Sequence, residues 1–267
     1  MRYREFRPSE PVRTFVERYW TLDAEGGPSD VQKVVPDGRA ELILNLGEPF
    51  EAFHNGRWQR QPVCFLAGQL TGPLLLRPRG PADILGVHFR PHGAAQFLGL
   101  PMRELSDSFV PVADLSRALA RELAEVRSVP ELDAVMARRA SALSEDRLIG
   151  EAVRRILQTR GAVDIAGLAR ALNLSSRQLE RRFQSGVGVS PKLFCRIQRF
   201  QQVFHVIGEE RPDWVTAAVE CGYYDQAHLI HDFKDFSGET PAVLLAGDEL
   251  ARHFLSHFSN TSPAASR

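Results

Sequence analysis

The sequence predicts an α+β fold, with a β-rich amino-terminal part and an all-helical carboxy-terminal part. Proline supports the first part, because 12 of the 17 prolines lie at or before Pro111 and proline is poorly tolerated inside helices. Short β-type runs punctuated by glycine and proline fill this part. From Asp114 onwards, apolar residues recur at intervals of three and four, which is the spacing of amphipathic helices.

Six runs in the first part are candidate strands, and their regular spacing favours a small antiparallel β barrel or a double sheet. His54-Asn55-Gly56-Arg57 predicts a hairpin, because Asn-Gly accepts the positive φ angles of a two-residue loop. The candidate strands are Val31–Val35, Glu41–Leu46, Phe50–His54, Val63–Leu66, Leu74–Leu76 and Asp83–Phe89.

Two amphipathic helices are expected next, separated by Ser128-Val-Pro130. Leu115, Leu119 and Leu123 recur at helical spacing before this break, and Leu132, Val135 and Met136 do so after it. We expect residues 112–145 to connect the two parts of the chain and to supply a face for a homodimer.

The overall charge conceals a strong division along the chain. The 33 basic and 33 acidic residues cancel, which at face value argues against a nucleic-acid partner. Residues 147–207, however, hold eleven basic and three acidic residues, a net charge of +8, and residues 208–250 hold two basic and ten acidic residues, a net charge of −8. A basic surface is therefore expected in the first of these blocks.

These two blocks are copies of one motif. Leu179, Phe183, Gly188 and Pro191 recur 50 residues later as Leu229, Phe233, Gly238 and Pro241, and each copy predicts a helix, a tight turn and a second helix. Ser175 and Gln178 form a capping-box pattern, and Asp225 is a good N-cap. The predicted helices are Ile165–Leu172 and Ser176–Ser185 in the first copy, Trp214–Cys221 and Gln226–Phe236 in the second, and a largely buried connecting helix Pro191–Ile207.

Residues 147–247 resemble the DNA-binding domain of the AraC family of bacterial transcription regulators. The resemblance rests on Leu179-Glu-Arg-Arg-Phe183 with Gly188-Val-Ser-Pro191, and on the matching segment from Glu220 to Pro241. It implies two helix-turn-helix units joined by a long helix, and double-stranded operator or promoter DNA as the partner.

The amino-terminal part more loosely resembles the cupin-like sensory domains of such regulators, through Val35-Pro-Asp-Gly38 and Gly86-Val-His-Phe-Arg-Pro91. This resemblance implies a small-molecule effector. The expected domains are 1–111, a β-rich cupin-like ligand-sensing domain; 112–145, the helical connection; 146–247, the DNA-binding domain; and 248–267, a flexible tail.

In the first unit, the outward face of the second helix is expected to enter the major groove. Arg181 stands where the family commonly has an arginine and suits guanine, whereas Arg177 could reach bases or phosphate. Arg182, Arg196 and Arg199 are expected to contact phosphate and set the register. The candidate DNA-binding residues of this unit are Arg177, Gln178, Glu180, Arg181, Arg182, Gln184, Arg196 and Arg199.

The second unit departs from the family pattern, because His231 stands where a second arginine is common. An unperturbed histidine is mostly uncharged at neutral pH, so a smaller electrostatic contribution is expected from this unit. Its acidic face could instead meet a basic protein surface, such as RNA polymerase or the partner domain. The candidate DNA-binding residues here are Gln226, Ala227, Ile230, His231 and Lys234.

A barrel mouth is a usual place for a small ligand, and the candidate wall residues are Trp20, Phe53, His54, Trp58 and His88. The alternatives are that the aromatic residues belong to the core, and that the first domain only dimerises or contacts protein. His88 and His92 have no third metal ligand nearby, so we expect neither a metal nor a cofactor.

No nucleophile motif or phosphate-binding loop is present, and we therefore expect a regulator and not an enzyme; a cupin-like enzyme is the remote alternative. The three cysteines are far apart and predict reduced thiols in a cytoplasmic protein. The longest apolar stretches are too short to span a bilayer, and the amino terminus does not resemble a signal peptide.

Overall fold

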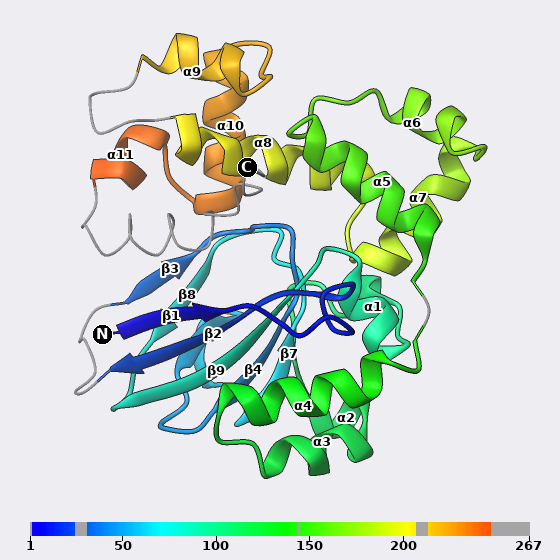
Figure 1. Ribbon diagram of the computed structural model, residues 1–267. Coiled ribbons are helices and arrows are strands. Elements are labelled where there is room, and N and C mark those ends of the chain that lie inside the picture. The colour runs from blue at the N-terminus through cyan, green and yellow to red at the C-terminus, as the bar shows by residue number, and fades with distance from the viewer. Residues whose placement is uncertain (1, 25–30, 144, 207–212, 247–267) are drawn as a thin grey trace, which may run out of the picture.

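The computed structural model describes residues 2–24, 31–143, 145–206 and 213–246 of the chain. Its fold class is α+β, as the sequence predicts, with sheets in the amino-terminal part and helices in the carboxy-terminal part (Figure 1). The predicted tail 248–267 and the last residue of the predicted connecting helix, Ile207, lie outside the described residues.

Two antiparallel sheets pack face to face, so the double sheet is found and the closed barrel is not. The larger sheet has the strand order β1-β2-β9-β4-β7-β10, and the smaller has the order β3-β8-β5-β6. The strands are β1 (Arg2–Phe6), β2 (Val16–Ala24), β3 (Gln32–Val34), β4 (Glu41–Asn45), β5 (Glu51–His54), β6 (Arg57–Arg60), β7 (Cys64–Ala67), β8 (Leu74–Arg77), β9 (Ala82–Phe89) and β10 (Phe109–Pro111).

All six predicted strands are present to within two residues, and β1, β2, β6 and β10 were not predicted. The hairpin at Asn55-Gly56 is confirmed, because both residues have the positive φ that a two-residue loop requires, 50° and 77°.

The central strand β9 is buried on both faces. Leu85, Val87 and Phe89 belong to a core shared with helices, whereas Ile84 faces the smaller sheet and belongs to a second core with Trp20. Because successive side chains of a strand point to opposite faces, one strand contributes to both layers. The larger sheet is therefore the middle layer between helices and the smaller sheet.

Helices cover the outer face of the larger sheet. The break at Ser128 is confirmed, since this residue is the N-cap of the second long helix of the group. The helices are α1 (Gly93–Leu98), the 3-10 helix Met102–Glu104, α2 (Val112–Leu115), α3 (Arg117–Ala124) and α4 (Val129–Ala140). The apolar residues of α3 and α4, Leu119, Leu123, Leu132, Val135 and Met136 among them, are buried in the same core as Val87 and Phe89. The apolar side of these helices is thus covered by the sheet, and a dimer face supplied by residues 112–145 stays a prediction.

The carboxy-terminal part contains both helix-turn-helix units, and the predicted helix bounds are confirmed to within two residues. Helix α8 runs between the units, and α6 with α7 and α9 with α10 form the two pairs (Figure 1). The helices are α5 (Arg147–Gln158), α6 (Ile165–Ala171), α7 (Ser176–Val187), α8 (Pro191–Val206), α9 (Trp214–Glu220), α10 (Gln226–Ser237) and α11 (Pro241–Ala246).

Local signals explain where these helices begin. Ser175 and Gln178 make the predicted capping box at the start of α7, and the Asp225 side chain accepts a hydrogen bond from the His228 amide at the start of α10. Gly222 begins the turn between α9 and α10 with φ 74°, the left-handed conformation that glycine adopts without strain.

The segment Val35–Gly38 joins the sheets to α8. The Gln201 side chain donates a buried hydrogen bond of 2.6 Å to the carbonyl oxygen of Pro36, and Val35 packs into the apolar core of the second unit. At Gly38, whose φ is 85°, a Cβ atom would lie 2.7 Å from the Phe194 ring. Only glycine allows the backbone to approach α8 this closely.

Candidate functional site

Helix α7 presents one polar face to solvent. Leu179 and Phe183 are fully buried in the core of the first unit, as predicted. Of the predicted recognition residues on this helix, Gln184 is half-buried and the others are exposed: Arg177, Gln178, Glu180, Arg181 and Arg182. The side of α7 that helical spacing predicted to face solvent is therefore the exposed side.

The arginines of this face carry their charge without internal compensation. Within the described part of the chain, neither Arg177 nor Arg181 makes an ion pair, and Glu180 pairs with neither. Arg182 lies beside a shallow groove that α7 forms with Pro101 and Arg103. Two guanidinium groups are thus available to an anionic partner along the first turns of α7.

Helix α10 presents a less charged face. Ala227, His231 and Lys234 are exposed, and Gln226 and Ile230 are half-buried. The imidazole Nε2 of His231 lies 3.5 Å from Oδ2 of Asp235, one turn further along. Lys234 is therefore the permanent positive charge on this face, in keeping with the weaker electrostatics predicted for the second unit.

Arg196 is held by protein groups in this structure, although we expected it to contact phosphate. Its Nε and Nη2 lie 3.0 Å and 2.7 Å from Oδ1 of Asp232, whose side chain is fully buried, and its Nη2 also lies 2.5 Å from Oδ2 of Asp235. The guanidinium lies over the Phe236 ring, 5.1 Å from its centroid. This arrangement ties α8 to α10.

Arg199 is held in a similar way. Its Nη1 donates a 3.0 Å hydrogen bond to the carbonyl oxygen of Gly161, and its guanidinium lies 5.5 Å from the centroid of the Tyr223 ring. Neither Arg196 nor Arg199 belongs to the exposed face formed by α7.

The acidic residues of the second unit serve the fold. Asp213 and Asp225 cap the amino-terminal ends of α9 and α10. Asp232 and Asp235 pair with Arg196, and Glu239 pairs with Lys33 at 2.6 Å. In the described residues 213–246, five of the six acidic residues are therefore used in caps and ion pairs.

A cavity of about 100 Å³ lies between the two sheets and is closed at one end by α8. Its walls are mainly apolar, and its ionisable wall residues are Lys33, Asp37, Arg39 and Glu41 with the phenol of Tyr3. The apolar side chains of the walls are Trp20, Leu22, Val34, Val35, Ile43, Phe50, Ala67, Leu70, Leu74, Leu76, Ile84 and Phe109.

Trp20 alone of the five predicted ligand residues lines this cavity. Phe53 and Trp58 are a cross-strand pair with ring centroids 5.3 Å apart, and Phe53 is 40% exposed. The guanidinium group of Arg77 lies over the Trp58 ring. His54 is the last residue of β5, next to the turn of the same hairpin. Because Phe50 and Ala52 of this segment point inward, Phe53 points to the opposite side.

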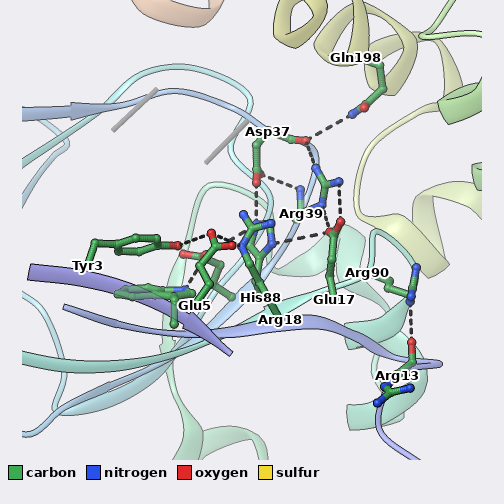
Figure 2. Close-up of polar contacts among 12 residues, drawn as sticks. Tyr3, Glu5, Arg13, Glu17, Arg18, Asp37, Arg39, His88, Arg90 and Gln198 are labelled. Carbon is green, nitrogen blue, oxygen red and sulfur yellow. Dashed lines mark hydrogen bonds and ion pairs between the residues drawn. The ribbon is translucent and has the colours of Figure 1, made fainter. Parts of the chain in front are cut away.

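His88 is fully buried behind the cavity wall, in a cluster of charged residues (Figure 2). Its Nε2 lies 2.8 Å from Oδ2 of Asp37 and 3.7 Å from Oε1 of Glu41, and its Nδ1 lies 3.7 Å from Oε2 of Glu17. The Arg39 guanidinium completes the cluster, 2.6 Å from Glu17. His88 thus organises carboxylates and is one layer away from the cavity.

Burial and charge oppose each other in this cluster. Burial disfavours the ionised form of Glu17, but the charges of Arg39, His88 and Arg18 outweigh it and lower its pKa to about 2. The same balance lowers the pKa of Asp37, chiefly through the hydrogen bond and charge of His88. For Glu41, burial prevails and raises the pKa.

The lowered pKa of Glu17 predicts a pH-dependent stability. Because its pKa is about 2 in the folded protein and about 4.5 in the unfolded chain, the stabilisation is complete above pH 4.5 and is lost as the pH falls towards 2. We expect Glu17→Gln to lower the free energy of unfolding at pH 7 by on the order of 2 kcal/mol. Urea denaturation of both proteins measures this difference. A difference between the two proteins that stays constant from pH 7 to pH 3.5 would contradict this.

Sequence reasoning missed Gln32, Glu41 and Gln201 at the cavity and Asp232 under α10. Three of them had a signal. Gln201 lies four residues after Ile197 on the buried face of its helix, Asp232 precedes the core residue Phe233, and Gln32 lies within the predicted strand Val31–Val35. A polar residue at a position that the pattern assigns to the interior indicates a specific partner.

The described residues contain no candidate metal site, no disulfide and no candidate membrane-spanning helix. They contain no group of three or more His, Cys, Asp or Glu residues placed to hold a metal ion. Cys64 is half-buried, Cys195 and Cys221 are buried, and all three are free thiols, as predicted. No helix in the part described is long and apolar enough to cross a membrane.

Two family models match the chain. A domain of unknown function (DUF6597) matches residues 4–111, and a helix-turn-helix domain of the AraC type matches residues 168–247. No curated protein matches.

Solved structures of similar arrangement include ToxT from Vibrio cholerae bound to an unsaturated fatty acid, at 10% identity and TM-score 0.46, covering 85% of this chain and 94% of that one. ToxT from the same organism bound to a methylnaphthalenyl butenoic acid shows 10% identity and TM-score 0.45, covering 89% and 99%. The AraC-like transcriptional activator CuxR shows 16% identity and TM-score 0.26, covering 75% and 85%.

The helix-turn-helix match coincides with the repeat read from the sequence and with the two helix pairs of the structure. Residues 168–247 therefore form a helix-turn-helix domain of the AraC type, which supports a DNA-binding transcription regulator.

Proposed function

We propose that the chain is a cytoplasmic, ligand-responsive regulator that reads operator DNA mainly through α7 and senses a small molecule in the cavity between its sheets. The observation that carries the DNA part is the exposed face of α7, where Arg177 and Arg181 have no ion-pair partner among the described residues. The second unit contributes a less charged face with one lysine, and the buried Asp232 and the exposed Asp235 hold it against α8 through Arg196.

In this proposal Arg181 contacts guanine, because a guanidinium donates paired hydrogen bonds to O6 and N7 in the major groove. Arg177 and Arg182 are assigned to bases or phosphate at the edges of the groove. Arg196 and Arg199 are assigned to holding the two units in register, since both are engaged by protein groups.

The sensing part is supported by a shared wall. Gln201 of α8 lines the cavity and bonds to Pro36, and the neighbouring Val35 and Asp37 also line it. A ligand that occupies the cavity therefore presses on the same segment that holds the connecting helix of the DNA-binding units. A bound ligand would shift the equilibrium between two relative positions of the DNA-binding units by the difference in the ligand's affinity for the two.

Loss of the Gln201 contact should alter DNA binding from a distance. We expect Gln201→Met to change operator affinity at least threefold in a fixed-salt titration, because one buried hydrogen bond between the two parts of the chain is removed. Gln202→Met, on a half-buried neighbour in the same helix, is the matched control. Equal affinity of Gln201→Met and wild type would argue that the amino-terminal part does not communicate with DNA through α8.

A second candidate is a DNA-binding regulator whose amino-terminal part only dimerises or contacts protein. The burial of the apolar stripe of α3 and α4 against the sheet weighs against dimerisation through that stripe. Homodimerisation and contact with RNA polymerase stay predictions, and sedimentation of the purified protein tests the first. Mapping its binding sites across the genome tests the regulatory role, because the sites should lie at promoters.

A further inference from the structure

The cavity has an apolar body and one polar end. Ionisable side chains gather where the segment Val34–Arg39 meets α8, and the opposite end is formed by leucine, isoleucine and phenylalanine side chains from both sheets. A ligand that fills this space must itself be mostly apolar, with any charge at one end.

Pairing among the wall residues leaves one carboxyl group without a close cation. Lys33 pairs with Glu239 at 2.6 Å, and Arg39 pairs with Glu17 at 2.6 Å. Asp37 receives the His88 Nε2 at 2.8 Å.

Glu41 is the exception. Its Oε1 accepts a 3.1 Å hydrogen bond from the Trp20 indole, and the nearest cationic group among the described residues is the same His88 Nε2, at 3.7 Å. That nitrogen is already engaged by Asp37, which is closer. In the wider cluster, the guanidinium groups of Arg18 and Arg39 pair with Glu5 and Glu17, and the His88 imidazole pairs with Asp37 (Figure 2). Among the described residues, no arginine or lysine makes an ion pair with Glu41. Burial raises the pKa of Glu41, and the charges of His88 and Arg18 offset this only in part.

Trp20 with the stacked Tyr3 ring lies beside the same carboxyl group, and further aromatic rings line the cavity. Tyr3 and Trp20 are stacked with centroids 6.0 Å apart, and both line the cavity together with Phe50 and Phe109. A Cβ atom at Gly86 would lie 1.9 Å from the Trp20 indole, so the glycine allows the ring to lie flat on β9. Aromatic faces attract cations, and here they stand beside an undercompensated carboxyl group.

Gln32 is a second polar feature that points to a ligand. It lines the cavity and is only 7% exposed, yet neither its amide oxygen nor its amide nitrogen has a hydrogen-bond partner among the residues that the structure describes. A buried amide without a partner is costly, and a ligand that offers a donor or an acceptor would remove that cost.

We propose that the cavity binds an amphiphilic cation, with an apolar or aromatic body between the sheets, an ammonium or amidinium group on Glu41 against the Trp20 and Tyr3 rings, and a hydrogen-bonding group near Gln32. This inference rests on the proposed sensing function and names the chemical class of the effector.

The test uses three probes that share one body and differ in their end group: phenylbutylamine, phenylbutanol and phenylbutyrate, each titrated into the full-length protein by calorimetry. The amine should bind at least about tenfold more tightly than the alcohol, because it forms a charge-assisted hydrogen bond with Glu41 that the alcohol lacks. The carboxylate should bind most weakly of the three.

Glu41→Gln removes the charge and keeps an oxygen for the Trp20 indole, so the amine should then bind no better than the alcohol. Glu48→Gln, on an exposed carboxylate paired with Arg60, is the matched control and should keep the preference for the amine. Thermal melting of both variants establishes that they are folded.

Three results would overturn the proposal: tightest binding of the carboxylate, a preference for the amine that survives in Glu41→Gln, or no binding of any probe at millimolar concentration. Operator binding without ligand is measured in parallel on the same preparations. If the wild-type protein does not bind operator DNA, the proposed regulatory function is wrong, whatever the cavity binds. If it binds operator DNA but does not respond to the amine, only the proposed cation site is wrong.

Discussion

Replacing Arg181 by alanine is expected to lower operator affinity at least tenfold, and by more than His231→Ala does. Arg181 is exposed on α7 and has no ion-pair partner among the described residues, so its guanidinium is free to make a bidentate contact of roughly 1–3 kcal/mol. The imidazole of His231 lies 3.5 Å from the Asp235 carboxylate, so it is not free in the way that Arg181 is. Fluorescence titration of an operator duplex at one fixed salt concentration measures both losses.

Arg57→Ala is the control for net charge, because Arg57 is exposed in the hairpin between β5 and β6, on the sheet side of the molecule. It should leave operator affinity unchanged. If His231→Ala and Arg181→Ala cost the same, the two units share the reading of DNA and the assigned asymmetry is wrong.

The second large effect is expected at the ion pair beneath α10. Arg196→Ala should lower the free energy of unfolding by roughly 3 kcal/mol, because it leaves the fully buried carboxylate of Asp232 without its cation. Urea denaturation of the full-length protein measures this. Arg154→Ala breaks an ion pair with Glu151 on the surface of α5 and should have a far smaller effect.

A paired variant separates the charge from the packing. Arg196→Met combined with Asp232→Leu replaces the ion pair by apolar groups and should recover most of the lost stability, since burying two charges is itself costly. Full stability of Arg196→Ala alone would show that the pair does not hold α10 to α8.

The local features of the DNA-binding units were predictable because their signals are local. The capping box at Ser175, the cap at Asp225 and the left-handed turn at Gly222 each depend on residues a few positions apart. The buried Leu179 and Phe183 follow from helical spacing, which fixes the opposite face as the exposed one.

Long-range partners were not predictable in the same way. Helical spacing could have placed Arg196 on either of two faces, and its carboxylate partner lies 36 residues further along the chain. A contact of this kind depends on how α8 and α10 pack, which no pattern within either helix encodes. The same limit applies to Gln201, whose acceptor Pro36 is 165 residues away.

Of the predicted ligand residues, only Trp20 lines the cavity, for a related reason. Phe53 and Trp58 are aromatic residues in strands, and the alternation of a strand shows that successive side chains face opposite sides but not which side meets the cavity. The register of β5 against β8 settles this, because it directs Phe50 and Ala52 inward and Phe53 outward. Residue type alone therefore pointed to aromatic side chains, but could not show that Trp20 faces the cavity while Phe53 and Trp58 do not.

The most direct test of the central claim is selection of bound sequences from a randomised duplex library by the full-length protein, repeated with Arg181→Ala. The account predicts one enriched motif that contains a guanine whose preference is lost in the variant, while binding of the variant to the remaining positions of the motif persists. Enrichment of no sequence, or an identical motif selected by wild type and Arg181→Ala, would contradict the claim that this chain reads DNA through α7.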